Sequence, residues 1–181
     1  GPYLIGVDGG TQSSKVVVYD AEGNVVSRGR QALRPMARPR QGVAVHPDDD
    51  LWESIAVASR QALDGFEGDR REIAGVGLCT IRCCRAFLTS DGSLLEPVIS
   101  WMDDRAYLPY VPDDPRLAFA TTSSGYLTHR LTGERRDSAA NNVLLPWSID
   151  TDTWQWSTDP ALFEQFVEAA VDAGFLVGFD R

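Results

Sequence analysis

The sequence predicts an α/β fold with a mixed sheet, opened by a three-stranded antiparallel meander and flanked by helices. Two apolar runs, residues 4–7 and 16–19, are joined by a short glycine-rich link, as is typical of a β-hairpin. A turn over residues 20–24 leads to a third predicted strand over residues 25–30. Residues 51–62 then carry apolar side chains at helical spacing. The apolar run over residues 73–78 indicates a buried strand.

The link between the first two strands predicts an anion-binding turn. Its glycines, Gly9 and Gly10, allow positive φ and a close approach to the backbone, and successive N–H groups in such a turn bind anions. Further donors and a positive charge come from Thr11, Ser13, Ser14 and Lys15. Asp8 repels phosphate but can hold Mg²⁺ through water. P-loop and Rossmann motifs do not fit, because both precede a helix. An ordinary hairpin turn explains the same residues equally well.

The middle of the chain alternates predicted elements with irregular segments. Residues 31–45 are expected to be irregular, and the arginines in and before them form a solvated face or, alternatively, an anion contact. These arginines are Arg28, Arg30, Arg34, Arg38 and Arg40. A helix is expected to start around His46-Pro47 and to end near Asp64. Further predicted elements are strands at 86–88 and 98–100, a loop over 107–122, and a helix from a Ser123-Ser124 cap to Gly133.

Composition narrows the classes of partner. The 181 residues suit one domain or slightly more, and the net charge of −9 disfavours nucleic acid and anionic membranes. No apolar run approaches the roughly 18 residues of a transmembrane helix, and no signal peptide is visible. Three neighbouring cysteines predict reduced thiols, a cytoplasmic location and at least one buried thiol: Cys79, Cys83 and Cys84. No zinc site is expected, because further soft ligands are lacking nearby.

Charged and aromatic residues follow the predicted strand at residues 98–100. Strand ends in open α/β sheets are where ligands usually bind. Trp101 offers an apolar face to the C–H surface of a sugar, and Asp103 can accept hydrogen bonds from hydroxyls. The alternative is an aromatic plug over the core with solvated charges beside it. For Arg82 and Arg85 the corresponding alternative is a pair of surface charges at the end of a strand.

Five stretches, taken in order, resemble the FGGY carbohydrate kinases, which include glycerol kinase and xylulokinase, within the sugar kinase/actin/Hsp70 superfamily. They are LIGVDGGTQSSKVVVYD, HPDDDLWES, GVGLCTIRCC, ISWMDDR and YLTHRLTGERRDSAANN. The resemblance implies a ribonuclease-H-like (actin-like ATPase) domain. It assigns residues 3–157 to an incomplete N-terminal kinase domain and leaves residues 158–181 as a helical tail of unclear match. It also implies a C-terminal ATP-binding domain that is absent from this chain.

The resemblance implies phosphorylation of a small sugar or polyol, such as the ketopentose xylulose, with ATP and Mg²⁺. Contacts with the transferred phosphate are implied for Gly10, Thr11, Gln12 and Ser13, and Asp8 would lie near the Mg²⁺, bound through water. Sugar contacts are implied for Arg82, Cys83, Trp101 and Asp103. Cys83 departs from the pattern, because glycerol kinase has an Arg-Glu pair here and xylulokinase a Met-His pair. This difference disfavours either exact substrate.

No catalytic residue is assigned within the chain. The general base of the family is an aspartate expected well beyond residue 157, and Asp172 does not match its context. The segment over residues 107–122 is also shorter than its counterpart in the family. The chain alone is therefore expected to be inactive or nearly so. A non-catalytic sugar- or phosphate-binding module of the same fold is the alternative, and a homodimer is a candidate assembly.

Overall fold

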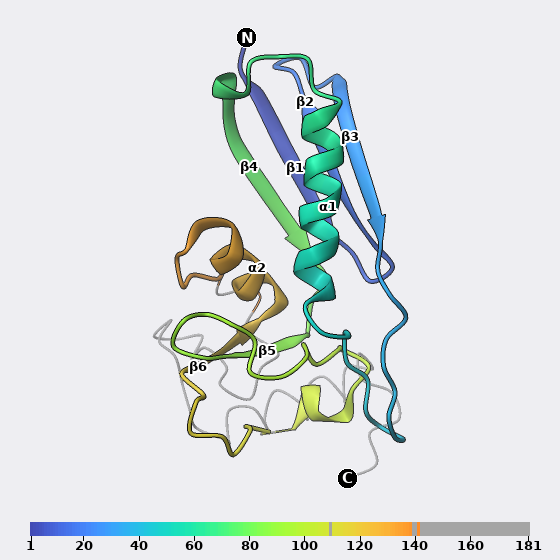
Figure 1. Cartoon of the computed structure of the whole chain (residues 1–181), viewed down its shortest axis with the longest axis vertical. Coiled ribbons are helices and arrows are strands. Elements are labelled where there is room, and N and C mark those ends of the chain that lie inside the picture. Colours follow the sequence, from blue (N-terminus) through green and yellow to red (C-terminus); the bar gives the residue numbers. More distant parts are fainter. Residues whose placement is uncertain (109, 139–140, 142–181) are drawn as a thin grey trace, which may run out of the picture.

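A four-stranded sheet carries a helix on one face, and a smaller two-stranded sheet lies near its lower end (Figure 1). The structure is a computed structural model that describes residues 1–108, 110–138 and 141. The large sheet contains β1 (Tyr3–Gly9), β2 (Ser13–Tyr19), β3 (Val25–Ala32) and β4 (Ile73–Thr80). Their order is β3-β2-β1-β4, and only the β1–β4 pair is parallel. The predicted α/β class, with a mixed sheet and an N-terminal meander, is therefore confirmed.

Helix α1 (Asp50–Asp64) lies across one face of the large sheet (Figure 1). The apolar positions at helical spacing are buried, as predicted: Leu51, Ile55, Ala58 and Ala62. Gly29 on β3 lets α1 pack close to the sheet, because a Cβ atom there would clash with the carbonyl oxygen of Ala58 on the helix. The helix ends before Gly65 as predicted, but it begins after Asp49, so Pro47 precedes it.

Strand β4 is less buried than predicted. Its residues are half-buried or exposed, and Val76 is 56% exposed. Within the described residues β4 forms an edge of the sheet, and α1 packs mainly on β2 and β3. The prediction of a buried strand is wrong because an apolar run does not reveal whether its strand lies at a sheet edge.

A second sheet pairs β5 (Arg85–Leu88) with β6 (Phe119–Thr122) in antiparallel register. Strand β6 lies in the segment predicted as a loop, and that prediction is wrong for its last four residues. Residues 98–100 form no strand, because Ile99 makes only isolated bridges with Val45 and Arg85. Short 3₁₀ helices span Arg70–Glu72, before β4, and Asp104–Tyr107, between β5 and β6.

Helix α2 (Ser123–Thr132) follows β6 without a connecting loop. Its N-cap is Thr122, whose side chain accepts a hydrogen bond from the N–H of Gly125, so the predicted serine cap is wrong by one residue. The serines form the first turn instead. Gly133 ends the helix with a φ of 76°, a left-handed conformation that glycine adopts without strain, as predicted.

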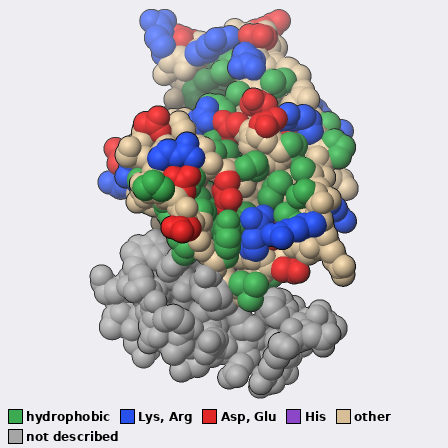
Figure 2. Space-filling view, turned by 60° about the horizontal axis from the view of Figure 1, so that its bottom comes forward, with side chains coloured by type: hydrophobic (Ala, Val, Ile, Leu, Met, Phe, Trp, Pro, Cys, Tyr) green, Lys and Arg blue, Asp and Glu red, His purple; other side chains and the backbone are tan. Residues whose placement is uncertain are grey.

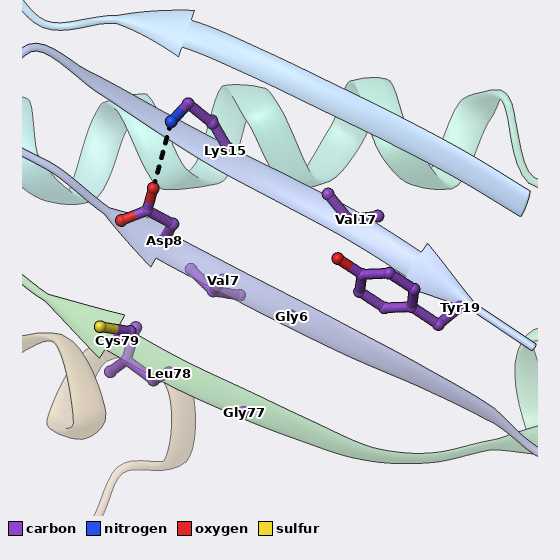
Figure 3. Close-up of a pocket in the computed structure, with 9 residues that line it drawn as sticks. All are labelled: Gly6, Val7, Asp8, Lys15, Val17, Tyr19, Gly77, Leu78 and Cys79. Atoms are coloured by element: carbon purple, nitrogen blue, oxygen red, sulfur yellow. Dashed lines mark hydrogen bonds and ion pairs between the residues drawn. The ribbon is translucent and has the colours of Figure 1, made fainter. Parts of the chain in front are cut away.

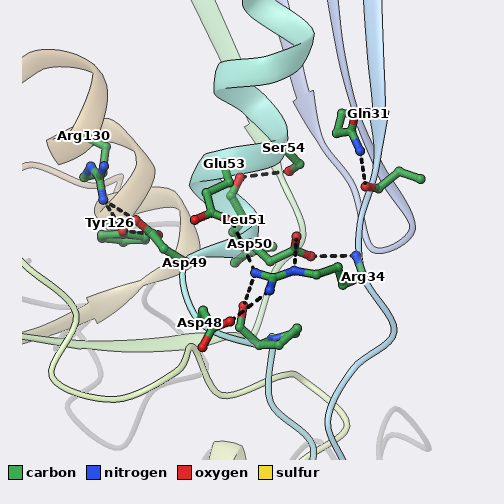
Figure 4. Close-up of polar contacts among 12 residues, drawn as sticks. Gln31, Arg34, Asp48, Asp49, Asp50, Leu51, Glu53, Ser54, Tyr126 and Arg130 are labelled. Carbon is green, nitrogen blue, oxygen red and sulfur yellow. Dashed lines mark hydrogen bonds and ion pairs between the residues drawn. The ribbon is translucent and has the colours of Figure 1, made fainter.

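Polar side chains join the start of α1 to its neighbours (Figure 4). Tyr126 and Arg130, both on α2, donate hydrogen bonds to the carboxylate of Asp49. Arg34, from the predicted basic cluster, pairs with three carboxylates: Asp48 at 2.9 Å, Asp50 at 3.0 Å and Glu53 at 3.3 Å. Arg34 therefore binds the start of α1 rather than an external anion.

The main core contains apolar side chains of the large sheet, α1 and α2, among them Val18, Ile55 and Leu127. A smaller cluster gathers around Phe87 and Ile99. Acidic and basic side chains are interspersed over the described surface visible in Figure 2 rather than gathered by sign. Within the described ranges, no helix has the length and apolar character needed to cross a membrane. The predicted tail, residues 158–181, lies outside the described residues.

Candidate functional site

The link between β1 and β2 is a tight turn. The N–H of Gly10 donates to the carbonyl oxygen of Ser13 at 3.2 Å, and a Cβ atom on Gly10 would come within 3.0 Å of that oxygen. Thr11 is half-buried and Gln12 is exposed at the tip of the turn. Ser13 is buried, and its hydroxyl accepts a hydrogen bond from Nε of Arg30 at 3.2 Å. This turn therefore offers a ligand its backbone and the side chains of Thr11 and Gln12, whereas the hydroxyl of Ser13 already binds Arg30.

Asp8 lies on the sheet face opposite α1, where β1 approaches its end (Figure 3). Its neighbour in register on β2 is Lys15, whose Nζ lies 3.3 Å from Oδ2 of Asp8. Both side chains are about half exposed and border a hollow of about 460 Å³ over β1, β2 and β4. The described residues contain no group of three or more metal-ligating side chains. A cation at Asp8 would therefore need water and phosphate oxygens as its other ligands, which suits Mg²⁺.

The segment after β4 approaches the glycine turn directly. The N–H of Ile81 donates to the carbonyl oxygen of Gly9 at 2.9 Å, because β1 and β4 run in parallel and end together. Arg82 and Cys83 follow, and Cys83 has a φ of 61°, a left-handed conformation that is strained for a residue other than glycine. Burial raises the pKa of the Cys83 thiol, while nearby Arg82 opposes that shift.

A pocket of about 290 Å³ connects the two segments. Its lining residues are Thr11, Ile81, Arg82, Cys83, Trp101 and Tyr107. The structure thus brings together one residue predicted to contact phosphate and three predicted to contact sugar. Tyr107 was missed from the sequence, because it lies in the segment predicted as a loop. Its hydroxyl donates to the carbonyl oxygen of Trp101 at 2.6 Å and so joins the two aromatic walls of the pocket.

Asp103, two residues after Trp101, is buried and does not line the pocket. Its Oδ2 accepts from the N–H of Ala44 at 2.8 Å and from Nη2 of Arg105 at 2.8 Å. Its Oδ1 accepts from the backbone N–H and Nε of Arg105, both at 2.9 Å. Burial disfavours the charged carboxylate, but these hydrogen bonds outweigh burial and lower the pKa of Asp103 below its ordinary value of 3.8. Both oxygens of Asp103 are therefore already used by the protein.

Arg85 is buried on β5 and is not a surface partner of Arg82. That interpretation is wrong, because the guanidinium of Arg85 donates to backbone carbonyls next to Tyr107. No sequence signal distinguishes such a buried arginine from an exposed one at a strand end. Of the three free cysteines, Cys84 is the buried thiol that was predicted, and burial raises its pKa to about 12. Asp172 and the tryptophans after residue 141 lie outside the described residues.

Residues 3–109 match the family model described as the N-terminal domain of the FGGY family of carbohydrate kinases. The chain belongs to the FGGY family. This result confirms the resemblance seen in the sequence motifs, and the match includes both the glycine turn and the Trp101 wall of the pocket.

Related proteins agree with the family and leave the substrate open. The chain is 49% identical to the uncharacterized sugar kinase YgcE of Escherichia coli over 164 residues, which cover 91% of this chain and 33% of YgcE. It is 28% identical to the glycerol kinase of Renibacterium salmoninarum over 170 residues, covering 84% of this chain and 32% of that enzyme. The chain thus spans about a third of the length of these curated FGGY relatives.

A solved structure supports the fold of this FGGY chain. The xylulose kinase of Lactobacillus acidophilus aligns with a TM-score of 0.72 at 18% identity, over 92% of this chain and 40% of that enzyme. At this identity the likeness establishes the actin-like α/β fold alone. The predicted fold class is confirmed, whereas the predicted site residues remain predictions.

Proposed function

We propose that the full-length protein transfers the γ-phosphoryl group of ATP to a hydroxyl of a small sugar or polyol. The observation that carries this proposal is the pocket that places Thr11, in the glycine turn, beside Arg82, Cys83 and Trp101. A phosphoryl donor held at the turn would lie next to a hydroxyl held in the pocket. Since phosphoryl transfer depends mainly on positioning and electrostatics, such adjacency is the central requirement.

Each predicted contact has a distinct part in this proposal. The backbone N–H groups of the turn, with Gly10, Thr11, Gln12 and Ser13, would hold the phosphate. Asp8 would bind Mg²⁺ through water, and Mg²⁺ bound there would neutralise phosphate charge.

The sugar side of the pocket combines polar and apolar groups. Arg82 would donate to sugar hydroxyls, and Trp101 would cover an apolar sugar face. Cys83 stays a neutral thiol at pH 7, because burial raises its pKa. Asp103 would support the pocket wall, since its oxygens bind Ala44 and Arg105. The described lining residues include no carboxylate or histidine. Proton abstraction is proposed for an aspartate outside this chain, as the family resemblance implies.

The substrate class proposed is a small sugar or polyol, with a ketopentose related to xylulose as the first candidate, since Cys83 disfavours xylulose and glycerol themselves. Relatives named as glycerol kinase and a structural neighbour named as xylulose kinase support this class of small hydroxylated acceptor. A non-catalytic module that binds sugar or phosphate in the same pocket is the competing proposal.

The test is ADP formation by the full-length protein over pentuloses, hexuloses, polyols and glycerol. We expect one of these acceptors to drive turnover. Asp8→Ala should abolish Mg²⁺-dependent nucleotide binding while circular dichroism remains unchanged. Glu22→Ala, at an exposed turn away from the pocket, is the matched control and should bind nucleotide normally. Sugar binding without any ADP formation would instead favour the non-catalytic module.

A further inference from the structure

Arg85 holds the chain on both sides of a pocket-lining residue. Its Nη2 donates to the carbonyl oxygen of Ala106 at 2.7 Å and to that of Leu108 at 2.6 Å, which flank Tyr107. Its Nη1 donates to the carbonyl oxygen of Tyr110 at 3.2 Å. One buried guanidinium thus binds three backbone carbonyls at and after the end of the 3₁₀ helix Asp104–Tyr107.

The backbone of Arg85 fixes the other end of the same wall. Its N–H donates to the carbonyl oxygen of Ile99 at 3.0 Å, and the N–H of Ile99 donates back at 2.9 Å. Trp101 comes two residues after Ile99, and its carbonyl oxygen accepts the hydroxyl of Tyr107. Backbone and side chain of Arg85 therefore enclose the segment that carries both aromatic walls of the pocket.

Burying a charged guanidinium costs desolvation free energy, which indicates that Arg85 has a specific role beyond filling space. Burial lowers the pKa of Arg85 to about 9, and nearby Asp103 opposes that shift, so the group remains charged at pH 7. An apolar side chain would occupy the same volume without the desolvation cost. Only the planar guanidinium fork presents several donors in fixed directions, which three separate carbonyls require.

We propose that Arg85 is a positioning residue that fixes Tyr107 and Trp101 in the pocket wall and thereby sets the affinity for the acceptor. The predicted effect on acceptor affinity rests on the kinase function proposed above. The order of the pocket wall can be measured without any turnover.

The first test replaces Arg85 with methionine in the full-length protein and compares steady-state constants. We expect the KM for the acceptor to rise at least about tenfold, as loss of several hydrogen bonds predicts, with the KM for ATP unchanged. Arg85→Lys should recover part of the loss, because lysine keeps the charge but not the fork. Arg116→Met is the matched control, since Arg116 forms an exposed pair with Asp114. Equal acceptor KM values in folded Arg85→Met and wild type would overturn the proposal.

The second test measures the pocket wall through the thiol of Cys83, in a Cys79→Ser background that removes the exposed cysteine. Cys83 is half-buried and lines the pocket with Tyr107, so a loosened wall should expose it. We expect maleimide labelling of Cys83, followed by peptide mapping, to be at least about tenfold faster in Arg85→Met than in Arg116→Met. Equal rates would contradict the positioning role.

If Arg85→Met does not fold, Tyr107→Phe provides the same labelling comparison, because it removes the hydroxyl that donates to the carbonyl oxygen of Trp101. If no acceptor drives turnover in the wild type, the kinase proposal fails. Faster Cys83 labelling would then still establish that Arg85 orders the wall.

Discussion

Replacing Asp103 with asparagine measures how strongly the hydrogen bonds of this carboxylate to Ala44 and Arg105 stabilise the segment next to the pocket. The change keeps the shape of the side chain but removes its charge and turns one oxygen into an NH₂ donor. Either orientation of the amide places that donor against two N–H groups, those on Oδ1 or those on Oδ2. Hydrogen bonds to charged groups contribute about 1.5–3 kcal/mol each, and removal of one partner of a buried pair costs about 3–5 kcal/mol. Since asparagine retains half of the contacts, we expect a local loss of about 3 kcal/mol.

Hydrogen–deuterium exchange at the Ala44 amide reads this loss directly, because that N–H donates to Asp103. A loss of about 3 kcal/mol corresponds to roughly 150-fold faster exchange in the full-length protein. Asp104→Asn is the matched control, since Asp104 is the exposed neighbour, and it should change exchange less than about threefold. Equal exchange in the two variants would refute the supporting role. If Asp103→Asn instead weakened acceptor binding with exchange unchanged, a direct contact between Asp103 and sugar would be favoured.

The pH dependence of the same amide provides a second check. Because the folded-state pKa of Asp103 lies below 3.8, its ionised form stabilises the wall fully above that pH. The stabilisation is lost as pH falls through the lowered pKa. After correction for intrinsic exchange, wild type and Asp103→Asn should therefore differ fully at pH 6 and converge only as the pH falls below 3.8 and through the lowered pKa of Asp103.

Three further changes test the framework around the site. Gly29→Ala should lower the thermal midpoint by the equivalent of about 1–3 kcal/mol, because its Cβ would clash with Ala58, whereas Gly77→Ala, with no close neighbour, should be tolerated. Thr122→Ala should cost about 1 kcal/mol in chemical denaturation through loss of the α2 cap, and Thr122→Ser should not; equal midpoints would contradict the capping role. Cys84 should be the last of the three cysteines to react with iodoacetamide at pH 7, and early labelling would contradict its burial.

The elements predicted correctly are those whose signal is local. The hairpin around Gly10 follows from two apolar runs and a glycine link, and α1 follows from the spacing of Leu51 and Ile55. Both signals lie within one turn or one helix. The family resemblance implied a phosphate contact for Thr11 and sugar contacts for Arg82, Cys83 and Trp101. These four residues line one pocket, and their roles stay predictions.

The features that sequence reasoning missed depend on distant parts of the chain. Strand β6 forms because Phe119–Thr122 pairs with β5. No pattern within the segment itself predicts this pairing. Arg85 is buried against the carbonyl of Ala106, 21 residues later in the sequence. Asp103 is buried against the N–H of Ala44, 59 residues earlier. Long-range contacts of this kind leave no periodicity, and so side-chain roles were less predictable than helices and strands.

Because β1 and β4 are parallel neighbours, evolution and protein engineering meet different constraints in the strands and in the segments that follow them. The Ile81–Gly9 hydrogen bond sets the offset between the glycine turn after β1 and the segment that follows β4. An insertion within either strand would shift that offset by about 3.3 Å and reverse the faces of the following residues. Reacting groups tolerate much less, since a misplacement of about 1 Å can cost about 100-fold in rate. Changes of acceptor preference should therefore accumulate by substitution at Arg82, Cys83 and Tyr107, where a mutant library can be confined, while the lengths of β1 and β4 stay fixed.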